Sequence, residues 1–239
     1  KTEKILRDII KKNNFKYVTT WTAADLFKTN ARNNLGIIGM SGQKGANKAV
    51  FNSDLILCLG THLSIPHTTT LYESYAQKSK KIIVNIDNKQ LKNLNIKFDL
   101  KINSDLKDYL KFLKKYLETK KRSYYWSNKI NYKKLNWYEG EESYKPNINN
   151  FIRLLTSKMP QKTCYIVDGG GTALYAGFQS TYIKTNQRLI CSTAISSMGT
   201  GLAETIGSYF TNKFNNYVCI IGDGSLLMNI QDLQSISQF

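Results

Sequence analysis

Three glycine-containing turns in the second half of the chain have residue types that could bind a phosphate group. They span residues 168–172, 192–199 and 222–225, and each follows an apolar run and precedes a stretch with helical character. Glycine lets the backbone approach a ligand closely, and the N–H groups at the start of a helix favour negative charge. One such turn is common in any fold. Three turns at the ends of neighbouring strands predict a ligand site at that edge of a sheet.

The third of these turns also carries a carboxylate. Asp223 lies between Gly222 and Gly224 and is followed by Ser225. Mg²⁺ in proteins takes carboxylates together with substrate phosphate oxygens. Because a carboxylate facing a diphosphate would repel it without a cation, the combination predicts a metal, with Asp223 as its side-chain ligand.

Apolar runs and helical spacing around the turns predict alternating strands and helices. Strands are expected at 163–167, 188–191 and 217–221, and helices at 148–157, 174–180, 199–210 and 226–239. In the first half we expect strands at 17–21, 54–60 and 81–87, and helices at 4–10, 46–52, 71–79 and 105–117. The strands lack polar alternation, and that at 54–60 is expected to be fully buried. The pattern predicts an α/β fold of two Rossmann-like units with parallel sheets flanked by helices.

The chain is expected to divide into a first domain at 1–117, a linker at 118–146 and a second domain at 147–239. The linker lacks sustained periodicity, and we expect it to pack over the surface through its aromatic residues, Tyr125, Trp126, Trp137 and Tyr138.

Composition narrows the class of protein. An apolar fraction of 41% is enough for a core, and no apolar run approaches the roughly 20 residues that span a membrane. The first twelve residues form a charged amphipathic pattern without the apolar core of a signal peptide, which favours a soluble, cytoplasmic protein. The four cysteines form no C-x-x-C pair and only two histidines are present, so buried free thiols are favoured over a zinc site.

The net charge of +17 raises the alternative of nucleic-acid binding. The lysines are nevertheless spread along the chain with many Asn, Ile and Tyr. The densest stretch, 111–134, alternates Lys with Tyr and Trp and could be a stacking surface for single strands. A solvated helix face followed by a linker is the preferred interpretation, and we expect no nucleic-acid partner.

The turns also carry a family resemblance. Residues 218–229 (VCIIGDGSLLMN), with Gln231, Asp232 and Leu233, resemble the first half of the thiamine diphosphate signature, which opens with G-D-G-S and closes with an asparagine roughly 25 residues later. Residues 168–178 and 192–207 resemble segments of acetolactate synthases. In the first half, residues 19–21, 36–47, 54–61 and 83–87 resemble the central domain of the same enzymes. Nearly the whole chain is thus similar to thiamine diphosphate-dependent enzymes of the acetolactate synthase type.

The resemblance implies roles for particular residues. Asp223 would ligate Mg²⁺, and Met198 would support the thiazolium ring and keep the cofactor bent. The carbonyl of Ser196 would meet the aminopyrimidine. The residues implied to bind the cofactor are Gly170, Gly171, Thr172, Ser196, Met198, Gly222, Asp223, Gly224 and Ser225. The bend brings the 4′-imino nitrogen next to the C2 proton, and the ring acts as an electron sink for decarboxylation of a 2-keto acid.

The resemblance also implies parts of the site that lie outside this chain. The closing asparagine would follow residue 239, and the pyrimidine-binding domain with its glutamate has no counterpart. The central domain is expected to lack its first strand. We therefore interpret the chain as part of a longer polypeptide that is inactive alone. The site would be completed by a pyrimidine-binding domain of the same or a second subunit, in a homodimer or homotetramer.

Substitutions beside the expected reacting end leave the reaction open. The H-Q-M-W segment of acetolactate synthases is Thr172-Ala173-Leu174-Tyr175 here, and Ala203 replaces a proline. Pyruvate or a related keto acid is the expected donor for a lyase or transferase. Carboligation, simple decarboxylation and acetyl transfer to a keto-sugar in surface-glycan biosynthesis are all consistent. A catalytically inactive nucleotide-binding or regulatory homologue is the alternative from another class.

A flavin is a further implication of the resemblance. Residues 39–42 and 60–62 match the flavin-contacting segments of acetolactate synthases only in part: His62 replaces an arginine, and the R-F-D-D-R continuation is missing. FAD, an adenine nucleotide and an empty pocket are the alternatives for the central domain.

Overall fold

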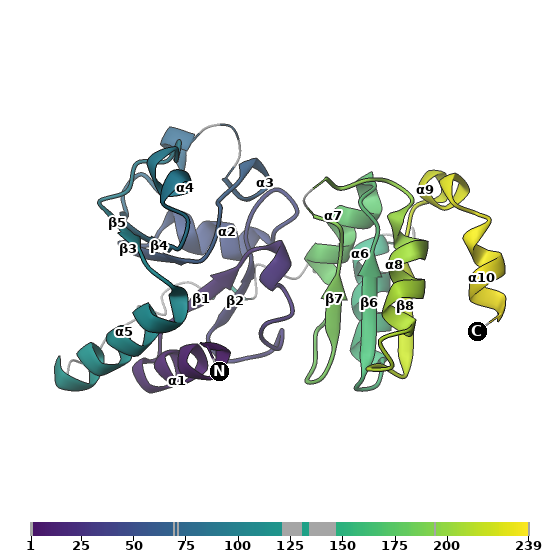
Figure 1. Cartoon of the computed structure of the whole chain (residues 1–239), viewed down its shortest axis with the longest axis horizontal. Helices are drawn as coiled ribbons and strands as arrows, with labels where there is room; N and C mark the ends of the chain where they lie inside the picture. Colours follow the sequence, from purple (N-terminus) through teal and green to yellow (C-terminus); the bar gives the residue numbers. More distant parts are fainter. Residues whose placement is uncertain are drawn as a thin grey trace.

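The computed structural model describes residues 2–68, 70, 72–120, 131–133, 147–193 and 195–238. Two α/β units lie side by side, the first running from α1 to α5 and the second from α6 to α10 (Figure 1). The first unit consists of α1 (Thr2–Asn13), β1 (Tyr17–Thr19), η1 (Trp21–Ala23), β2 (Asn34–Ile37), α2 (Lys44–Phe51), β3 (Leu55–Leu59), α3 (Ile65–Thr68), η2 (Tyr72–Ser74), β4 (Lys80–Asn85), α4 (Asn88–Lys92), β5 (Leu100–Asn103) and α5 (Leu106–Lys120). The second consists of α6 (Ile148–Lys158), β6 (Thr163–Val167), α7 (Gly171–Ser180), β7 (Arg188–Ile190), α8 (Thr200–Tyr209), β8 (Asn216–Ile220), α9 (Asp223–Met228) and α10 (Asp232–Gln238).

The described strands of the first unit form two parallel sheets, one of order β1-β2 and one of order β3-β4-β5. Pairing between β1 and β2 shifts register, since Tyr17 pairs with Asn34 but Thr19 pairs with Ile37. The extra residue lies next to Gly36, whose φ of +112° suits a β-bulge. The sequence pattern predicted neither β2 nor β5.

Several expectations for the first unit need correction. The strand at 54–60 is not fully buried, because β3 is an outer strand and Leu55 is 56% exposed. No helix forms over the described part of 71–79: η2 is a single 3₁₀ turn, and the φ of +46° at Ala76 is incompatible with its continuation. The strand expected at 17–21 ends at Thr19, and the 3₁₀ helix η1 begins at Trp21. The helices expected at 4–10, 46–52 and 105–117 are confirmed as α1, α2 and α5.

The second unit is built on one parallel sheet of order β7-β6-β8. All five residues of the central strand β6 are buried, which accounts for its purely apolar or small side chains. The predicted strands and the helices α6, α7 and α8 are confirmed. The single helix expected at 226–239 is instead two, because the backbone leaves the helical conformation at Asn229.

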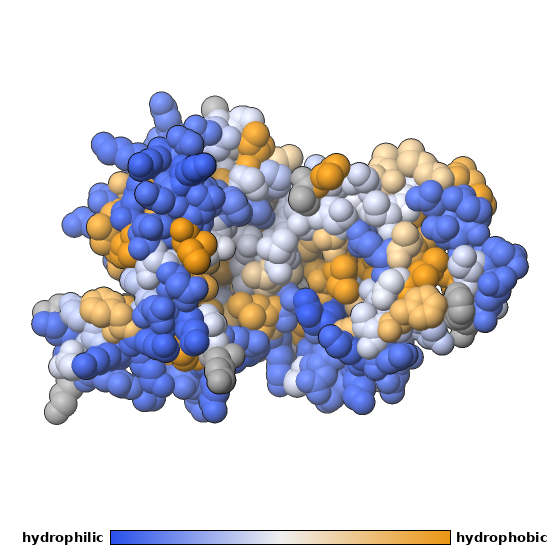
Figure 2. Space-filling model, viewed as in Figure 1, coloured by the Kyte–Doolittle hydropathy of each residue, from blue (hydrophilic) through white to orange (hydrophobic). Residues whose placement is uncertain are grey.

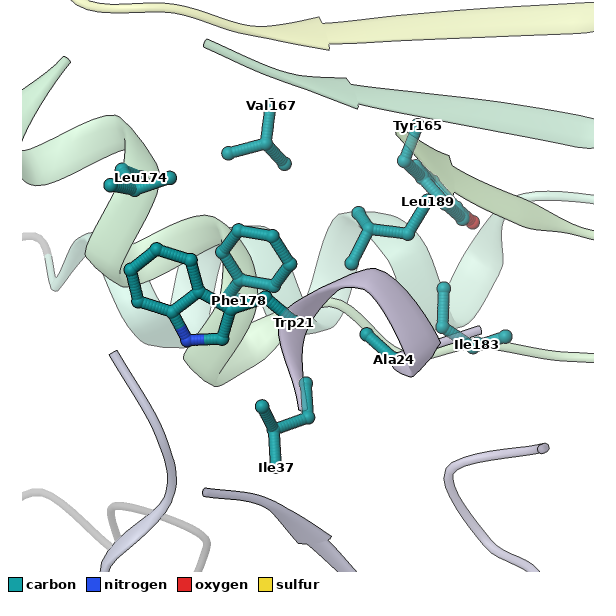
Figure 3. Close-up of a cluster of buried hydrophobic side chains, with 9 residues drawn as sticks. All are labelled: Trp21, Ala24, Ile37, Tyr165, Val167, Leu174, Phe178, Ile183 and Leu189. Carbon is teal, nitrogen blue, oxygen red and sulfur yellow. The ribbon is translucent and has the colours of Figure 1, made fainter. Parts of the chain in front are cut away.

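The two units share one hydrophobic core (Figure 3). The indole of Trp21 stacks on the ring of Phe178, with ring centroids 5.2 Å apart and planes inclined by 17°. Beside them, the Asp25 carboxylate accepts hydrogen bonds from Arg188 Nε at 2.5 Å and from the Leu189 N–H at 2.9 Å. The arrangement of the units is therefore fixed by buried apolar contact as well as by polar pairs.

Of the expected linker, residues 118–120 continue α5, and the four aromatic residues expected to pack over the surface, Tyr125, Trp126, Trp137 and Tyr138, lie outside the described ranges. All four cysteines are free thiols, with Cys58 and Cys164 buried and Cys191 and Cys219 partly buried. In the part of the chain that the structure describes, no helix is long and apolar enough to cross a membrane.

Candidate functional site: three turns at the carboxyl edge of the second sheet

The three glycine-containing turns meet at one edge of the second sheet (Figure 1). Strands β6, β7 and β8 are parallel, with Ile166 paired to Ile190 and Val167 paired to Ile220. The carboxyl ends of the three strands therefore lie at the same edge of the sheet, and each turn connects its strand to the helix that follows. This edge is the usual ligand-binding edge of open parallel sheets.

Asp168 ties the first turn to the helix that follows the second. Its side chain is fully buried. Oδ1 accepts a hydrogen bond from the Gly201 N–H at 2.9 Å, and Oδ2 accepts one from the Gly170 N–H at 3.1 Å. Hydrogen bonds to a carboxylate are among the stronger ones. This residue therefore fixes the start of α8 against the turn after β6.

Gly170 is the point at which all three turns come into contact. A Cβ atom at this position would lie 2.5 Å from Ser225 Oγ and 3.2 Å from Met198 Cγ. Because a real Cβ requires more than about 3 Å, only glycine fits here without a shift of its neighbours. Three predicted site residues from three turns, Gly170, Met198 and Ser225, are thus brought together.

Open space lies beside this contact. A Cβ atom on Gly171 or Gly222 would meet nothing within 4 Å, and Thr172, Asp223 and Gly224 are exposed. The first hydrogen bonds of the adjoining helices run from the Leu174 N–H to Gly170 O and from the Leu226 N–H to Gly222 O. The N–H groups at the beginning of α7 and α9 therefore precede the helical ladder and have no acceptor within their own helix.

The second turn contains two residues with positive φ, of which Ser196 is the strained one. Ser196 has a φ of +54°, and Gly199, the residue before α8, has a φ of +87°. The Ser196 N–H donates to Ser192 O at 2.9 Å. The carbonyl oxygen of Ser196 lies against Gly169, where a Cβ would be only 2.5 Å from it. Non-glycine residues with positive φ persist where their surroundings enforce them, often at functional sites.

Two apolar side chains on this turn face outward. Met198 is 47% exposed, and Ile195 is 82% exposed. The Cε of Met198 would lie 3.8 Å from a Cβ on Gly224. An exposed apolar side chain next to open space is available to support an apolar ring.

Asn229 is a positioning residue that the sequence pattern did not assign. Its Nδ2 donates to Gly199 O at 2.9 Å, which ties the end of α9 to the second turn. Asn229 lies four residues after the G-D-G-S motif, but nothing in the local pattern identifies its partner.

Glu204 is a second unassigned polar residue near the turns. Its Oε2 is buried, and no hydrogen bond to it is formed by the residues that the structure describes. Burial raises the pKa of this carboxyl, and the nearby Asp168 raises it further, whereas the Thr200 hydroxyl and the Ser192 N–H act in the opposite direction. Glu204 lies in α8 among small or apolar residues, so the spacing of residue types in the sequence did not identify it.

Asp223 begins α9 and is exposed. Within the described ranges, no group of three or more His, Cys, Asp or Glu side chains could hold a metal ion. Asp223 would therefore hold Mg²⁺ only together with other ligands, of which phosphate oxygens are typical.

The turn at 39–42, one of the two segments with a partial flavin-contact match, packs against another segment of the first unit. The Met40 N–H donates to Pro66 O at 2.8 Å, and a Cβ on Gly39 would lie 2.2 Å from the same oxygen. Ser41 is fully buried. The backbone of this turn is therefore packed against the chain's own helix α3.

Comparison with known proteins identifies the class. Residues 1–113 match the family model described as the thiamine pyrophosphate enzyme central domain. Residues 168–239 match the one described as the thiamine pyrophosphate enzyme C-terminal TPP binding domain. The chain belongs to the thiamine pyrophosphate (thiamine diphosphate) enzyme family.

Within that family the chain is similar to acetolactate synthase large subunits. That of Buchnera aphidicola subsp. Schizaphis graminum is 28% identical over 244 residues, covering 98% of this chain and 41% of the relative. The large subunit of Cyanidium caldarium is 29% identical over 217 residues, covering 86% of this chain and 36% of the relative. The acetolactate synthase isozyme 2 large subunit of Escherichia coli is 25% identical over 209 residues, covering 85% of this chain and 36% of the relative. The chain thus spans about two fifths of the length of these relatives or slightly less.

Proposed function

We propose that this chain supplies the diphosphate-and-metal half of a thiamine diphosphate site, in an enzyme that decarboxylates or ligates a 2-keto acid such as pyruvate. The observation that carries the proposal is the contact of Gly170, Met198 and Ser225 beside the open faces of Gly171 and Gly222. Acetolactate synthase-like chemistry is the preferred reaction, because the relatives reported above are named for it.

The diphosphate would be held by backbone donors. The N–H groups of Gly171 and Thr172 at the start of α7, and those of Gly224 and Ser225 at the start of α9, precede the helical ladder. Helix starts favour anions. Gly170 contributes no donor, since its N–H already donates to Asp168; its lack of a side chain leaves room for Ser225 and Met198. Gly222 allows close approach from the side of β8.

A cation would be needed in the same place. The exposed carboxylate of Asp223 adjoins the donors of α9, so an unaccompanied diphosphate would meet its negative charge. Mg²⁺ between the carboxylate and the phosphate oxygens removes that repulsion. The remaining ligands would come from water and from residues other than those described.

The apolar and strained residues of the second turn would position the rings. Met198 lies next to the diphosphate donors and would support the thiazolium, and the carbonyl of Ser196 would accept from the aminopyrimidine. The bound cofactor supplies an electron sink for loss of the substrate carboxylate. The task of this chain's residues is to bind, bend and orient it.

The site is open on the side of α9, where we propose that a pyrimidine-binding domain of the same or a second subunit completes it. Apolar residues lie exposed there (Figure 2), including Leu227 at 66% and Met228 at 57%. We propose a homodimer or homotetramer in the cytoplasm, with no nucleic-acid partner. The chain alone is expected to be inactive, and its turnover of pyruvate with thiamine diphosphate and Mg²⁺ would contradict that.

Titration calorimetry with three ligands tests the proposal. Thiamine diphosphate and inorganic diphosphate should both bind the chain in the presence of Mg²⁺ and compete with each other, whereas thiamine should bind far more weakly. Asp223→Asn should abolish most of the Mg²⁺ dependence, while Asp108→Asn on α5 should not. Equal affinities for thiamine and thiamine diphosphate would contradict a diphosphate site.

A further inference from the structure

A cavity of about 210 Å³ lies between the two units, away from the three turns. Thr29 and Asn34 line it from the first unit, and Arg153 and Tyr182 line it from the second. A second hollow of about 860 Å³ shares Asn30, Arg153 and Tyr182 with the cavity, so the two adjoin. Gln161 and Thr185 in this hollow precede β6 and β7. The hollow therefore lies toward the amino edge of the second sheet, whereas the turns lie at its carboxyl edge.

The cavity and the adjoining hollow together form a cleft, and the charged residues among its described lining are all positive. Lys133 and Arg153 line the cavity, and Lys28 and Lys184 line the hollow; no Asp or Glu is among the described lining residues of either. In a chain of +17 net charge such a cleft attracts anions.

One lysine of the cavity, Lys133, is held in an unfavourable environment, next to Lys16 outside the lining. Burial lowers the pKa of Lys133, and the neighbouring charge of Lys16 lowers it further. The pKa of Lys16 is lowered by burial and by Arg32. Lys133 Nζ donates to the carbonyl oxygen of Ala31 at 2.5 Å, but a carbonyl does not neutralise a cation. A bound anion would relieve the repulsion among these groups.

Volume and charge together indicate the chemical class of the ligand. The cavity is smaller than the roughly 300–1,000 Å³ of sites that enclose a drug-sized molecule, so it suits one compact group. An oxyanion with several acceptor oxygens matches an Arg fork and a Lys point charge. More than one cation at the cleft favours a dianion over a single carboxylate.

We propose that the cleft between the units binds the phosphate group of a small phosphorylated molecule, with the remainder of that molecule in the adjoining hollow. Residues of both units line the cavity, so the bound phosphate bridges them and stabilises their arrangement by mass action. This inference does not depend on the function of the turns.

Calorimetric titration of the full chain with inorganic phosphate at low salt tests the proposal. We expect saturable binding that weakens with added NaCl. Lys133→Met should weaken it at least about tenfold, as truncation of one partner of a partly buried charge pair does, and Lys133→Arg should retain most of it. Lys28→Met carries the same test, with a smaller loss, if Lys133→Met does not fold. Lys107→Met on α5 is the matched control and should bind as the parent does.

The diphosphate turns are a competing place for the same probe. Asp223→Asn should leave phosphate affinity unchanged if the ligand lies in the cleft. Absence of saturable binding, equal affinity in the parent, Lys133→Met and Lys28→Met, or a change confined to Asp223→Asn would each overturn the proposal. Failure of thiamine diphosphate to bind would leave it standing, because the two sites lie at opposite edges of the sheet.

Discussion

Gly170 lies between the second and third turns, so replacing it with alanine tests the contact on which the candidate site depends. The new Cβ would lie 2.5 Å from Ser225 Oγ, too close for any real pair, and 3.2 Å from both Met198 Cγ and Asp168 Oδ2. Ser225 is only 1% exposed and its backbone belongs to α9, so its hydroxyl has little room to move. Overpacking of this kind costs about 1–3 kcal/mol.

A second substitution isolates the cause. Removing the hydroxyl in Ser225→Ala takes away the closest contact and leaves only the two at 3.2 Å, so Gly170→Ala/Ser225→Ala should recover most of the lost stability. The measurement is urea unfolding of the parent, both single variants and the double variant, followed by circular dichroism. We expect a coupling free energy of at least about 0.5 kcal/mol, as for residues in contact. Additive effects would show that the turns after β6 and β8 do not touch, and would refute the geometry of the site.

Three further predictions follow from other contacts. Trp21→Ala should cost about 3–5 kcal/mol in urea unfolding, because the indole fills the core shared by the two units; a cost below about 1 kcal/mol would mean that the units do not share that core. Asn229→Ala should cost about 0.5–1.5 kcal/mol through loss of its bond to Gly199 O, and should weaken thiamine diphosphate binding; unchanged stability and unchanged binding would deny it a positioning role. Burial raises the pKa of Glu204, so the folded state favours the protonated carboxyl. This preference stabilises the fold fully below the ordinary glutamate pKa. The stabilisation is lost as the pH rises through the raised pKa of the folded state. Glu204→Gln should therefore be more stable than the parent at pH 7, and the difference should vanish at acid pH. If the parent instead gains stability relative to Glu204→Gln as the pH rises, the pKa of Glu204 is not raised by folding.

The parts of the fold that depend on local pattern could be predicted from the sequence. β6 lies in the middle of its sheet and is buried on both faces, so its residues had to be apolar or small, and its end is marked by an aspartate and glycines. β2 was missed because it is short and contains Gly36 in a positive-φ conformation. The helix expected at 71–79 had suitable periodicity, but packing of the chain around Ala76 selected a turn.

The site shows the same division. Glycine and Asp223 identified the turns because close backbone approach and metal binding require those residue types. The partners of Asp168 and Asn229 could not be predicted, since each bonds a backbone group about 30 residues away in sequence and any polar group could have served. Trp21 was assigned to a strand end for a similar reason: local spacing does not reveal that its ring stacks on Phe178 of the other unit.

A crystal structure of the chain with thiamine diphosphate and Mn²⁺, which substitutes for Mg²⁺ and gives an anomalous signal, is the most direct test of the proposed site. We predict one anomalous peak within coordination distance of the Asp223 carboxylate, with the diphosphate against the N–H groups at the starts of α7 and α9 and the thiazolium next to Met198. A metal peak away from Asp223, or a diphosphate bound elsewhere on the chain, would contradict the account.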